Sequence, residues 1–292
     1  MIYLNPENDE KFQVKKNTLH QNLLIPEVLP LGNMSICMVD DGYLLAIRQF
    51  NYFFKDDYAY EFINGDFFFG RNYFFVLVDK EFNYKKTIKI VNRTNLDIKL
   101  LEDVKLTKQG NIITICGTYV SNKKIQIVVF SCIFNGITLT TTKNYYLSSW
   151  NYTDFQKNWM MLPDENLSFL KDVKDNELVL FNLIDKEISI SRFGIKKSSG
   201  SAALSIYKNF YIALVHRRNK FMYNFNLICF DRQWNCRFFS DDFKFTKTPV
   251  EFSCGFVMDK DDFVIPVTEN DATTTFFKVK FEHLLKKLNI KL

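Results

Sequence analysis

The sequence predicts an all-β protein, a five-bladed β-propeller, and three observations support this prediction. The 292-residue chain is 16% aromatic, with 31 Phe and 14 Tyr, and aromatic side chains favour the pleated, half-buried surface of a strand. A unit of two apolar strands joined by a short polar turn recurs five times. Helical periodicity is confined to the C-terminus, where Glu282 to Lys291 predicts a short helix or a tail.

The five hairpin units are spaced as propeller blades are. Each turn contains Asp, Asn or Gly, the residues that tight turns favour. The turns lie about 30 to 70 residues apart, which suits four-stranded blades with variable outer loops. In order, the units are Met34 to Arg48, Val104 to Thr118, Leu170 to Asn182, Ala202 to Arg217 and Cys254 to Glu269. We therefore expect each unit to form the inner hairpin of one blade.

Further strand candidates lie between the units and supply the outer strands. They are Tyr73 to Val78, Ile125 to Phe134 and Leu227 to Phe230, each followed by a turn containing Asp or Asn. The only cluster of small residues, Ser198 to Ala203, runs directly into a strand and is too short for a linker. The sequence thus predicts one domain over residues 1–292, with a propeller core from about residue 30 to 285.

Composition and charge exclude several classes of protein. The chain is 47% hydrophobic and 24% charged, so it has enough apolar side chains for a core and is not disordered. Its net charge of +5 is spread along the chain without a basic run, which argues against a nucleic-acid partner. No apolar run matches a membrane span, and the polar N-terminus lacks a signal sequence, so we expect a cytoplasmic protein without a membrane partner.

The cysteine pattern predicts structural thiols. Six Cys occur without a C-x-x-C motif and with only three His as co-ligands. We therefore expect reduced thiols, no metal site and no cofactor. Gly-rich nucleotide loops and a G-x-S-x-G nucleophile motif are also missing from the sequence.

Polar residues at the start of each unit are expected to meet at one mouth of the propeller, because inner strands surround its central channel. Five short clusters occupy these positions: Asn33-Met34-Ser35, Glu102 to Lys105, Lys157-Asn158-Trp159, Ser199-Gly200-Ser201 and Glu251 to Gly255. The Glu102-Asp103 pair is the candidate chemical centre among them. In a regular strand these two side chains point to opposite faces, so only one of them is expected to face the channel.

Several short motifs resemble those of a known family and occur in its order. Asn33-Met34-Ser35-Ile36 resembles N-P-S-I, the run Leu101 to Leu106 resembles L-E-D-x-R-L, and Gln156 to Trp159 resembles E-K-N-W. Gly200 to Ala203, Val215 to Arg217, Val250 to Gly255 and Asn270 to Ala272 follow in register. From about residue 30 to 285 the chain is thus similar to the five-bladed propellers of glycoside hydrolase family 130 and the related glycosyltransferase family 108.

This resemblance implies an inverting carbohydrate-active enzyme, either a β-mannoside phosphorylase or a mannosyltransferase. Its partners would be an oligosaccharide or glycan and inorganic phosphate, a sugar phosphate or a nucleotide sugar. Asp103 would be the catalytic acid/base. The candidate substrate-binding residues are Asn33, Arg48, Asn51, Glu102, Asn158, Trp159, Glu251 and Asp271. The candidate phosphate-binding residues are Arg48, Lys105, His216 and Arg217.

Two alternatives remain open. An inverting hydrolase needs a second carboxylate to activate water, and Glu251, Glu269 and Asp271 are the candidates. A catalytically silent propeller that binds a glycan or a protein is the other alternative, because three residues depart from the family motifs. Met34 replaces Pro, Gln156 replaces Glu, and Lys105 replaces an Arg, which removes a bidentate donor. Trp159 either offers an aromatic face to a sugar or packs between blades.

Overall fold

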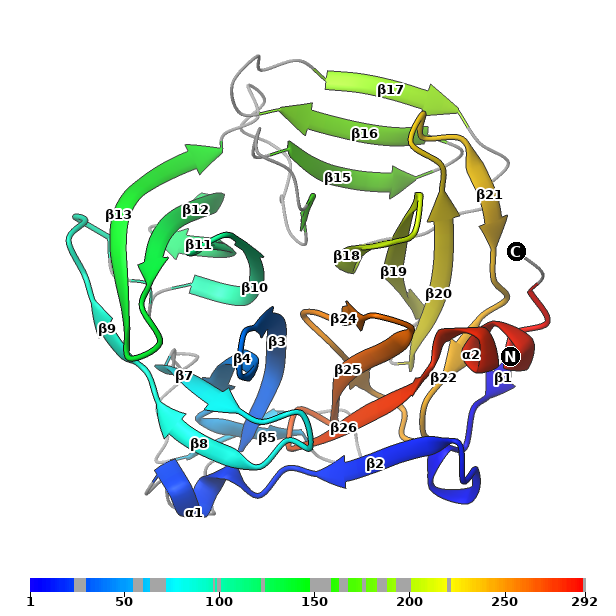
Figure 1. The fold of residues 1–292 in the computed structure, drawn as a ribbon, viewed down its shortest axis with the longest axis horizontal. Helices are drawn as coiled ribbons and strands as arrows, with labels where there is room; N and C mark the ends of the chain where they lie inside the picture. The colour runs from blue at the N-terminus through cyan, green and yellow to red at the C-terminus, as the bar shows by residue number, and fades with distance from the viewer. Residues whose placement is uncertain are drawn as a thin grey trace.

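Five β-sheets surround a common axis in the computed structural model, as Figure 1 shows, and this confirms the predicted five-bladed propeller. The structure describes residues 1–23, 30–54, 60–63, 72–96, 98, 101–121, 124–147, 159–162, 168–174, 177–182, 188–192, 201–219 and 222–290.

The first two blades begin with long inner strands. Blade 1 consists of β3 (Leu31–Val39), β4 (Gly42–Gln49), β7 (Asn72–Val78) and β8 (Tyr84–Thr87). Blade 2 consists of β10 (Leu101–Gln109), β11 (Ile112–Ser121), β12 (Lys124–Phe134) and β13 (Thr138–Leu147), with β9 (Lys89–Val91) pairing in parallel at its outer edge. A hairpin of β5 (Tyr52–Phe54) and β6 (Tyr60–Phe62) follows blade 1's second strand.

The other three blades have shorter or divided inner strands. Blade 3 consists of β14 (Met160–Met161), β15 (Ser168–Lys174), β16 (Glu177–Asn182) and β17 (Ile188–Arg192). Blade 4 consists of β18 (Ser201–Tyr207), β19 (Phe210–Asn219), β20 (Met222–Phe230), β21 (Cys236–Phe239), β22 (Phe243–Lys244) and β1 (Ile2–Tyr3). Blade 5 consists of β23 (Glu251–Phe252), β24 (Val257–Asp259), β25 (Asp262–Glu269), β26 (Thr273–Lys280) and β2 (Phe12–Lys16).

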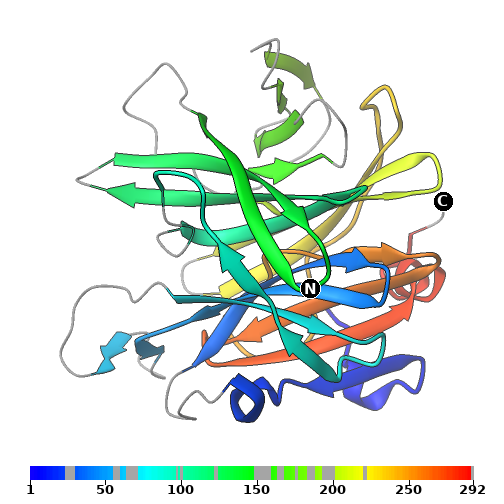
Figure 2. The same ribbon diagram turned by 60° about the vertical axis from the view of Figure 1, so that its left-hand side comes forward.

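The N-terminal segment joins the ring to the C-terminal end of the chain. Strand β2 pairs antiparallel with β26, and the two run side by side in Figures 1 and 2. The 3-10 helix η1 (Pro6–Asn8) precedes β2, and the helix α2 (Phe281–Lys287) follows β26; a short helix α1 (Leu19–Leu23) lies after β2. Asp9 contacts His283 at 2.9 Å and Lys287 at 2.8 Å, so ion pairs join the two ends as well.

Four of the five predicted units are confirmed as inner hairpins. They turn at the register pairs Val39↔Gly42, Gln109↔Ile112, Tyr207↔Phe210 and Asp259↔Asp262. The unit Leu170 to Asn182 also forms a hairpin, β15 with β16, but its position in the blade differs from the prediction. The two-residue strand β14 pairs with β15 and contacts β10 and β18, so β14 is the inner strand. A strand this short gives no recognisable sequence pattern.

The hydrophobic core consists of five clusters, each between two neighbouring blades. One example is the cluster between blades 2 and 3, where Cys116 and Val129 meet Met161 and Phe169. The others lie between blades 1 and 2, 3 and 4, 4 and 5, and 5 and 1. All six cysteines are free thiols and five are buried. Among the described residues, no helix combines the length and the apolar character needed to cross a bilayer.

Candidate active site

Two neighbouring inner strands carry a β-bulge at the same place, near where each strand begins. The register shifts between Gly32 and Ser35 in β3, and between Glu102 and Lys105 in β10. Asn33 and Asp103 lie in these bulges with φ of 44° and 49°, a left-handed conformation that Asn and Asp adopt more readily than other non-glycine residues. Bulges redirect side chains, and here Asn33 Nδ2 donates a hydrogen bond to Asp103 Oδ1 at 3.3 Å.

The bulge in β10 corrects the expectation that Glu102 and Asp103 point to opposite faces. Both carboxylates face Arg48: its Nη2 lies 3.8 Å from Glu102 Oε1, and its Nη1 lies 3.7 Å from Asp103 Oδ1. The strict alternation of a strand fails because the extra residue interrupts the ladder. Arg48 is only 4% exposed, and its guanidinium lies 5.0 Å from the centre of the Phe50 ring. One buried cation therefore holds both acidic side chains.

Lys105 and His216 add a second cationic side to the site. Among the residues that the structure describes, the buried Lys105 side chain donates one long hydrogen bond, at 3.5 Å, to the backbone oxygen of Asp103. Burial, together with the nearby Lys105 charge, lowers the pKa of His216 from 6.5 to about 4, although Asp103 opposes this shift. His216 is therefore neutral at pH 7. Its Nδ1 is buried and has no hydrogen-bond partner among the described residues.

Asp271 brings a third carboxylate from blade 5. It lies in the turn between β25 and β26, with φ of 51°. Burial raises the pKa of Asp271 to about 6; the Arg48 charge lowers it and the Asp103 charge raises it. These electrostatic contacts place Asp271 with Arg48 and Asp103 in one site. Asp271 therefore changes its protonation state near neutral pH.

We call the group formed by these residues the charged cluster. Its members are Asn33, Arg48, Glu102, Asp103, Lys105, His216 and Asp271. All seven were predicted as site residues from the sequence, and blades 1, 2, 4 and 5 bring them together.

Tyr73 and Cys254 also belong to this site, although the sequence did not single them out. The Tyr73 hydroxyl accepts a hydrogen bond from the Val104 backbone N–H at 3.5 Å, inside the bulge of β10. Tyr73 is also the register partner of Arg48. This pairing cannot be recognised from the sequence, because a long segment separates β4 from β7. The buried Cys254 thiol has a pKa raised by burial and interacts with the charges of Asp103 and Lys105. Cys254 lies in the Glu251 to Gly255 cluster, and membership of this cluster is the sequence signal that could have identified it.

Three other predicted residues have different surroundings. Both oxygens of the fully buried Glu251 accept hydrogen bonds, from Phe245 N at 2.9 Å and from Thr246 N and Oγ1 at 2.7 and 2.6 Å. Arg217 pairs with Asp242 at 3.0 Å within blade 4. Trp159 is 2% exposed and packs between blades 2 and 3, as the packing interpretation predicts.

Of the last two predicted residues, the structure describes only Asn51. Asn51 precedes β5, where its backbone oxygen accepts a hydrogen bond from Ile63 at 2.7 Å. Asn158, with Gln156, lies outside the described residues. No group of three His, Cys, Asp or Glu side chains in the described part of the chain is arranged to hold a metal ion.

The charged cluster has the groups that acid catalysis next to a bound anion requires. Asp103 is held by Asn33 and Arg48, so its orientation is fixed. Lys105 supplies a buried positive charge and His216 a neutral imidazole, which together suit an oxyanion. Asp271 supplies a further carboxyl group that changes protonation state near pH 6. These groups are of the chemical types that proton transfer beside an anion uses.

Comparisons with solved structures agree with the observed fold. A β-1,2-mannobiose phosphorylase from Listeria innocua, in complex with β-1,2-mannobiose, is 12% identical over 97% of this chain and 95% of its own, with a TM-score of 0.60. A glycoside hydrolase of the GH130 family of mannoside phosphorylases, which targets β-1,2-mannosidic linkages in Candida mannan, is 9% identical over 87% and 85%, with a TM-score of 0.59.

A mannose phosphorylase from Leishmania mexicana, in complex with a phosphate ion, is 13% identical over 88% of this chain and 86% of its own, with a TM-score of 0.52. No protein-family model and no curated protein matches the sequence. At these identities the likeness establishes the shared propeller fold.

Proposed function

We propose that this protein is an inverting enzyme of β-mannosides, and that it cleaves them by phosphorolysis or forms them from a sugar phosphate. The observation that carries this proposal is the charged cluster, in which Asp103 lies between Arg48 and the Lys105 and His216 side chains. The similar structures support it, because two of them are phosphorylases of mannosides or mannose, one with a bound sugar and one with phosphate.

Asp103 is the proposed acid. Inverting cleavage needs an acid that protonates the leaving oxygen while the nucleophile arrives from the opposite face of the sugar. The Asp103 Oδ1 atom accepts a hydrogen bond from Asn33 Nδ2 and lies 3.7 Å from Arg48 Nη1, and these two contacts orient the carboxyl group. In the reverse direction the same carboxylate accepts the proton of the acceptor hydroxyl.

Lys105 and His216 are the proposed phosphate-binding groups, with Arg48 beside them. Arg48 faces two carboxylates, so the charge available to an incoming anion comes mainly from Lys105. Lysine binds phosphate as a point charge, so Lys105 keeps the positive charge of the family's arginine but not its bidentate fork. Neutral His216 adds a donor through one ring nitrogen. A transferred sugar phosphate or a nucleotide sugar would place its phosphate in the same position.

Hydrolysis is the second candidate function. The presence of the Asp271 carboxyl group in the charged cluster favours it. A hydrolase needs a base besides the acid, and Glu251 is already engaged by three hydrogen bonds. Asp271 interacts with Arg48 and Asp103, and its pKa of about 6 makes it ionised at pH 7. In a phosphorylase this residue would instead bind sugar hydroxyls.

The test is to incubate the protein with β-1,2-mannobiose, with and without phosphate, and to measure mannose 1-phosphate and free mannose. Synthesis is assayed in parallel from mannose 1-phosphate or GDP-mannose with mannose as acceptor. Phosphorolysis predicts mannose 1-phosphate only when phosphate is present, with loss of product in Asp103→Asn and Lys105→Met. Lys108→Met is the matched control, because Lys108 lies on the same strand beyond the cluster and pairs with Asp40 at 2.7 Å.

The other outcomes separate the alternatives. Free mannose without phosphate, lost in Asp271→Asn, would identify a hydrolase. No turnover of any sugar, together with measurable mannobiose binding, would contradict the proposal and indicate a silent glycan-binding propeller.

A further inference from the structure

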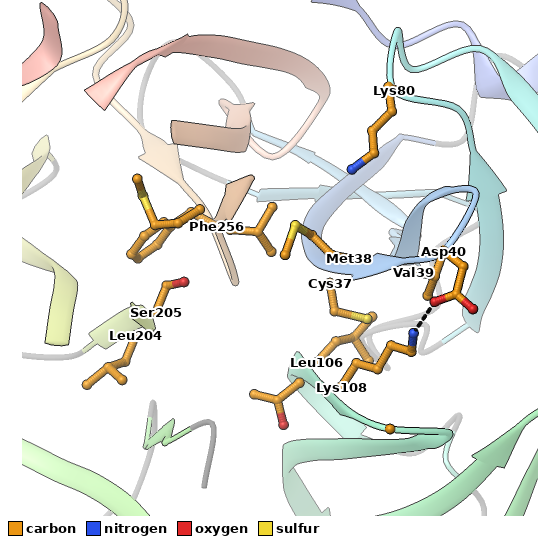
Figure 3. A pocket seen from close by; sticks show the side chains of 14 residues that line it. Cys37, Met38, Val39, Asp40, Lys80, Leu106, Lys108, Leu204, Ser205 and Phe256 are labelled. Carbon is orange, nitrogen blue, oxygen red and sulfur yellow. Dashed lines mark hydrogen bonds and ion pairs between the residues drawn. The ribbon is translucent and has the colours of Figure 1, made fainter. Parts of the chain in front are cut away.

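A second pocket lies at the other end of the inner strands, where they turn into the next strand (Figure 3). Its volume is 460 Å³, within the range of small-molecule sites. Two of the strands that build the charged cluster, β3 and β10, also build this pocket through residues further along each strand, and β18 and residues 256–258 complete it. Its main lining residues are Met38, Leu106, Lys108, Leu204, Ser205 and Phe256.

Tight contacts between inner strands separate this second pocket from the charged cluster. The Leu106 backbone N–H donates a hydrogen bond to Ser35 Oγ at 2.9 Å, which joins β10 to β3. Gly255 approaches the same hydroxyl so closely that a Cβ on this residue would lie 2.7 Å from Ser35 Oγ. Leu106 lines the pocket on one side of these contacts, and Lys105 belongs to the charged cluster on the other side. A ligand in one site therefore does not occupy the other.

Several apolar side chains line the second pocket beside its polar ones. Phe256, Leu106 and Leu204 are buried in its wall, whereas Met38 is 38% exposed. In Figure 3 the side chains of Met38, Ser205 and Phe256 surround the same open space. A flexible thioether beside an aromatic ring adapts well to flat or irregular apolar groups. The pocket therefore suits a hydrocarbon or aromatic group better than a sugar.

One cation at the rim is available to a ligand. Lys80 also lines the pocket, but its ammonium bonds Asp259 at 2.6 Å and lies 4.5 Å from the centre of the Tyr43 ring. Lys108 is different: its side chain is 21% exposed, and the side chain of its partner Asp40 is 94% exposed. An ion pair with so exposed a carboxylate contributes little to stability. A ligand anion can therefore replace Asp40 at small cost.

We propose that the second pocket binds a small organic anion with an apolar body. Its single anionic group pairs with Lys108, and its hydrocarbon or aromatic part contacts Met38, Leu106 and Phe256. This inference does not depend on the proposed sugar chemistry, because the charged cluster takes no part in it.

The probe for this proposal is the anionic fluorophore 1-anilinonaphthalene-8-sulfonate, compared with its neutral analogue N-phenyl-1-naphthylamine. We expect saturable binding of the anionic probe with one site per chain, and weaker binding of the neutral probe. Lys108→Met should weaken binding of the anionic probe about tenfold and leave binding of the neutral probe unchanged. Saturating phosphate and β-1,2-mannobiose should compete with neither probe.

Two further variants keep the test decisive. Ser205→Trp adds an indole within the pocket and should abolish binding of both probes. Lys143→Met should change neither, because Lys143 lies on the outer strand β13 and lines neither this pocket nor the adjoining groove that shares Lys108 with it. Near-ultraviolet circular dichroism and the Tm check that each variant is folded. The proposal is overturned if the folded wild type shows no saturable binding, if Ser205→Trp retains it, or if the neutral probe binds as tightly as the anionic one.

Discussion

The two ends of the propeller axis differ in chemistry although the inner strands β3 and β10 contribute to both. At one end, bulges in β3 and β10 redirect polar side chains, and the charged cluster results. At the other end the register of these strands is regular up to the hairpin turn, and apolar side chains line the second pocket. Local irregularity of the backbone, more than composition, thus decides at which end the charged cluster forms.

The largest expected effect is on catalysis, and it separates the two ends most clearly. Asp103→Asn keeps an acceptor for Asn33 but removes the acid, so kcat for β-1,2-mannobiose phosphorolysis should fall by about 100-fold or more. Ser205→Trp, at the second pocket, should leave kcat unchanged. Steady-state kinetics of both variants check this, and equal losses in the two would show that the ends are not independent.

The next effect is on stability. Arg48→Met leaves Glu102 and Asp103 without their shared buried cation, which should lower the free energy of unfolding by about 3 kcal/mol. The matched control is Arg217→Met, because the Arg217–Asp242 pair is about one-third exposed and should contribute less than about 1 kcal/mol. Urea unfolding at pH 7 measures both values. A similar loss of unfolding free energy in the two variants would mean that the buried Arg48 pairs contribute no more to stability than the partly exposed Arg217–Asp242 pair.

A further effect on the free energy of unfolding is expected when acidification protonates His216. Its pKa is about 4 in the folded protein and near 6.5 when unfolded, so between these values only the unfolded state takes up the proton. Above pH 6.5, His216 therefore does not lower the free energy of unfolding. As the pH falls from 6.5 toward 4, it lowers this free energy progressively. Relative to His216→Asn, the wild type should lose up to about 1.4 kcal/mol per pH unit in this window.

Urea unfolding of the two proteins from pH 7 to 4 provides the measurement. Glu251 and Asp271 titrate in both proteins, so their contributions largely cancel in the difference. A difference that does not vary with pH, or that grows in favour of the wild type on acidification, would contradict a buried neutral His216.

The smallest effect concerns the hydroxyl groups that hold the bulge of β3. Thr268 Oγ1 accepts a hydrogen bond from the Asn33 backbone N–H at 2.8 Å and shares another with Thr274 Oγ1 at 3.0 Å. Thr268→Val leaves that N–H without a partner, so Asn33 should position Asp103 less well and kcat should fall about tenfold with KM unchanged. Thr268→Ser should restore kcat. A loss that Ser does not restore would indicate a packing effect.

Much of the fold was predictable because hairpins depend on local sequence. Turns such as Asp40-Asp41-Gly42 specify a register between adjacent segments, and four inner hairpins follow from them. The pairings of β1 with β22 and of β2 with β26 were not predictable, because they join segments more than 200 residues apart. Blade 3 was misread because its inner strand β14 has only two residues.

The candidate site was predictable in its residues but less so in its geometry. The motifs around Asn33, Arg48, Asp103 and His216 identified positions that the fold brings together. Alternation along β10 gave the wrong orientation for Glu102 and Asp103, because a bulge with positive φ has no periodic signal. Likewise, nothing in the sequence shows that Glu251 is engaged by the segment at Phe245 and Thr246, since that contact depends on tertiary packing.

Binding of inorganic phosphate tests the central claim most directly, because it reports on the charged cluster without requiring the right sugar. Isothermal titration of phosphate is compared in the wild type, Lys105→Met and Lys108→Met, two lysines of the same strand at opposite ends of the axis. We predict saturable binding that Lys105→Met weakens about tenfold and Lys108→Met leaves unchanged. Loss of phosphate binding in Lys108→Met with retention in Lys105→Met, or no binding to the folded wild type, would contradict the account.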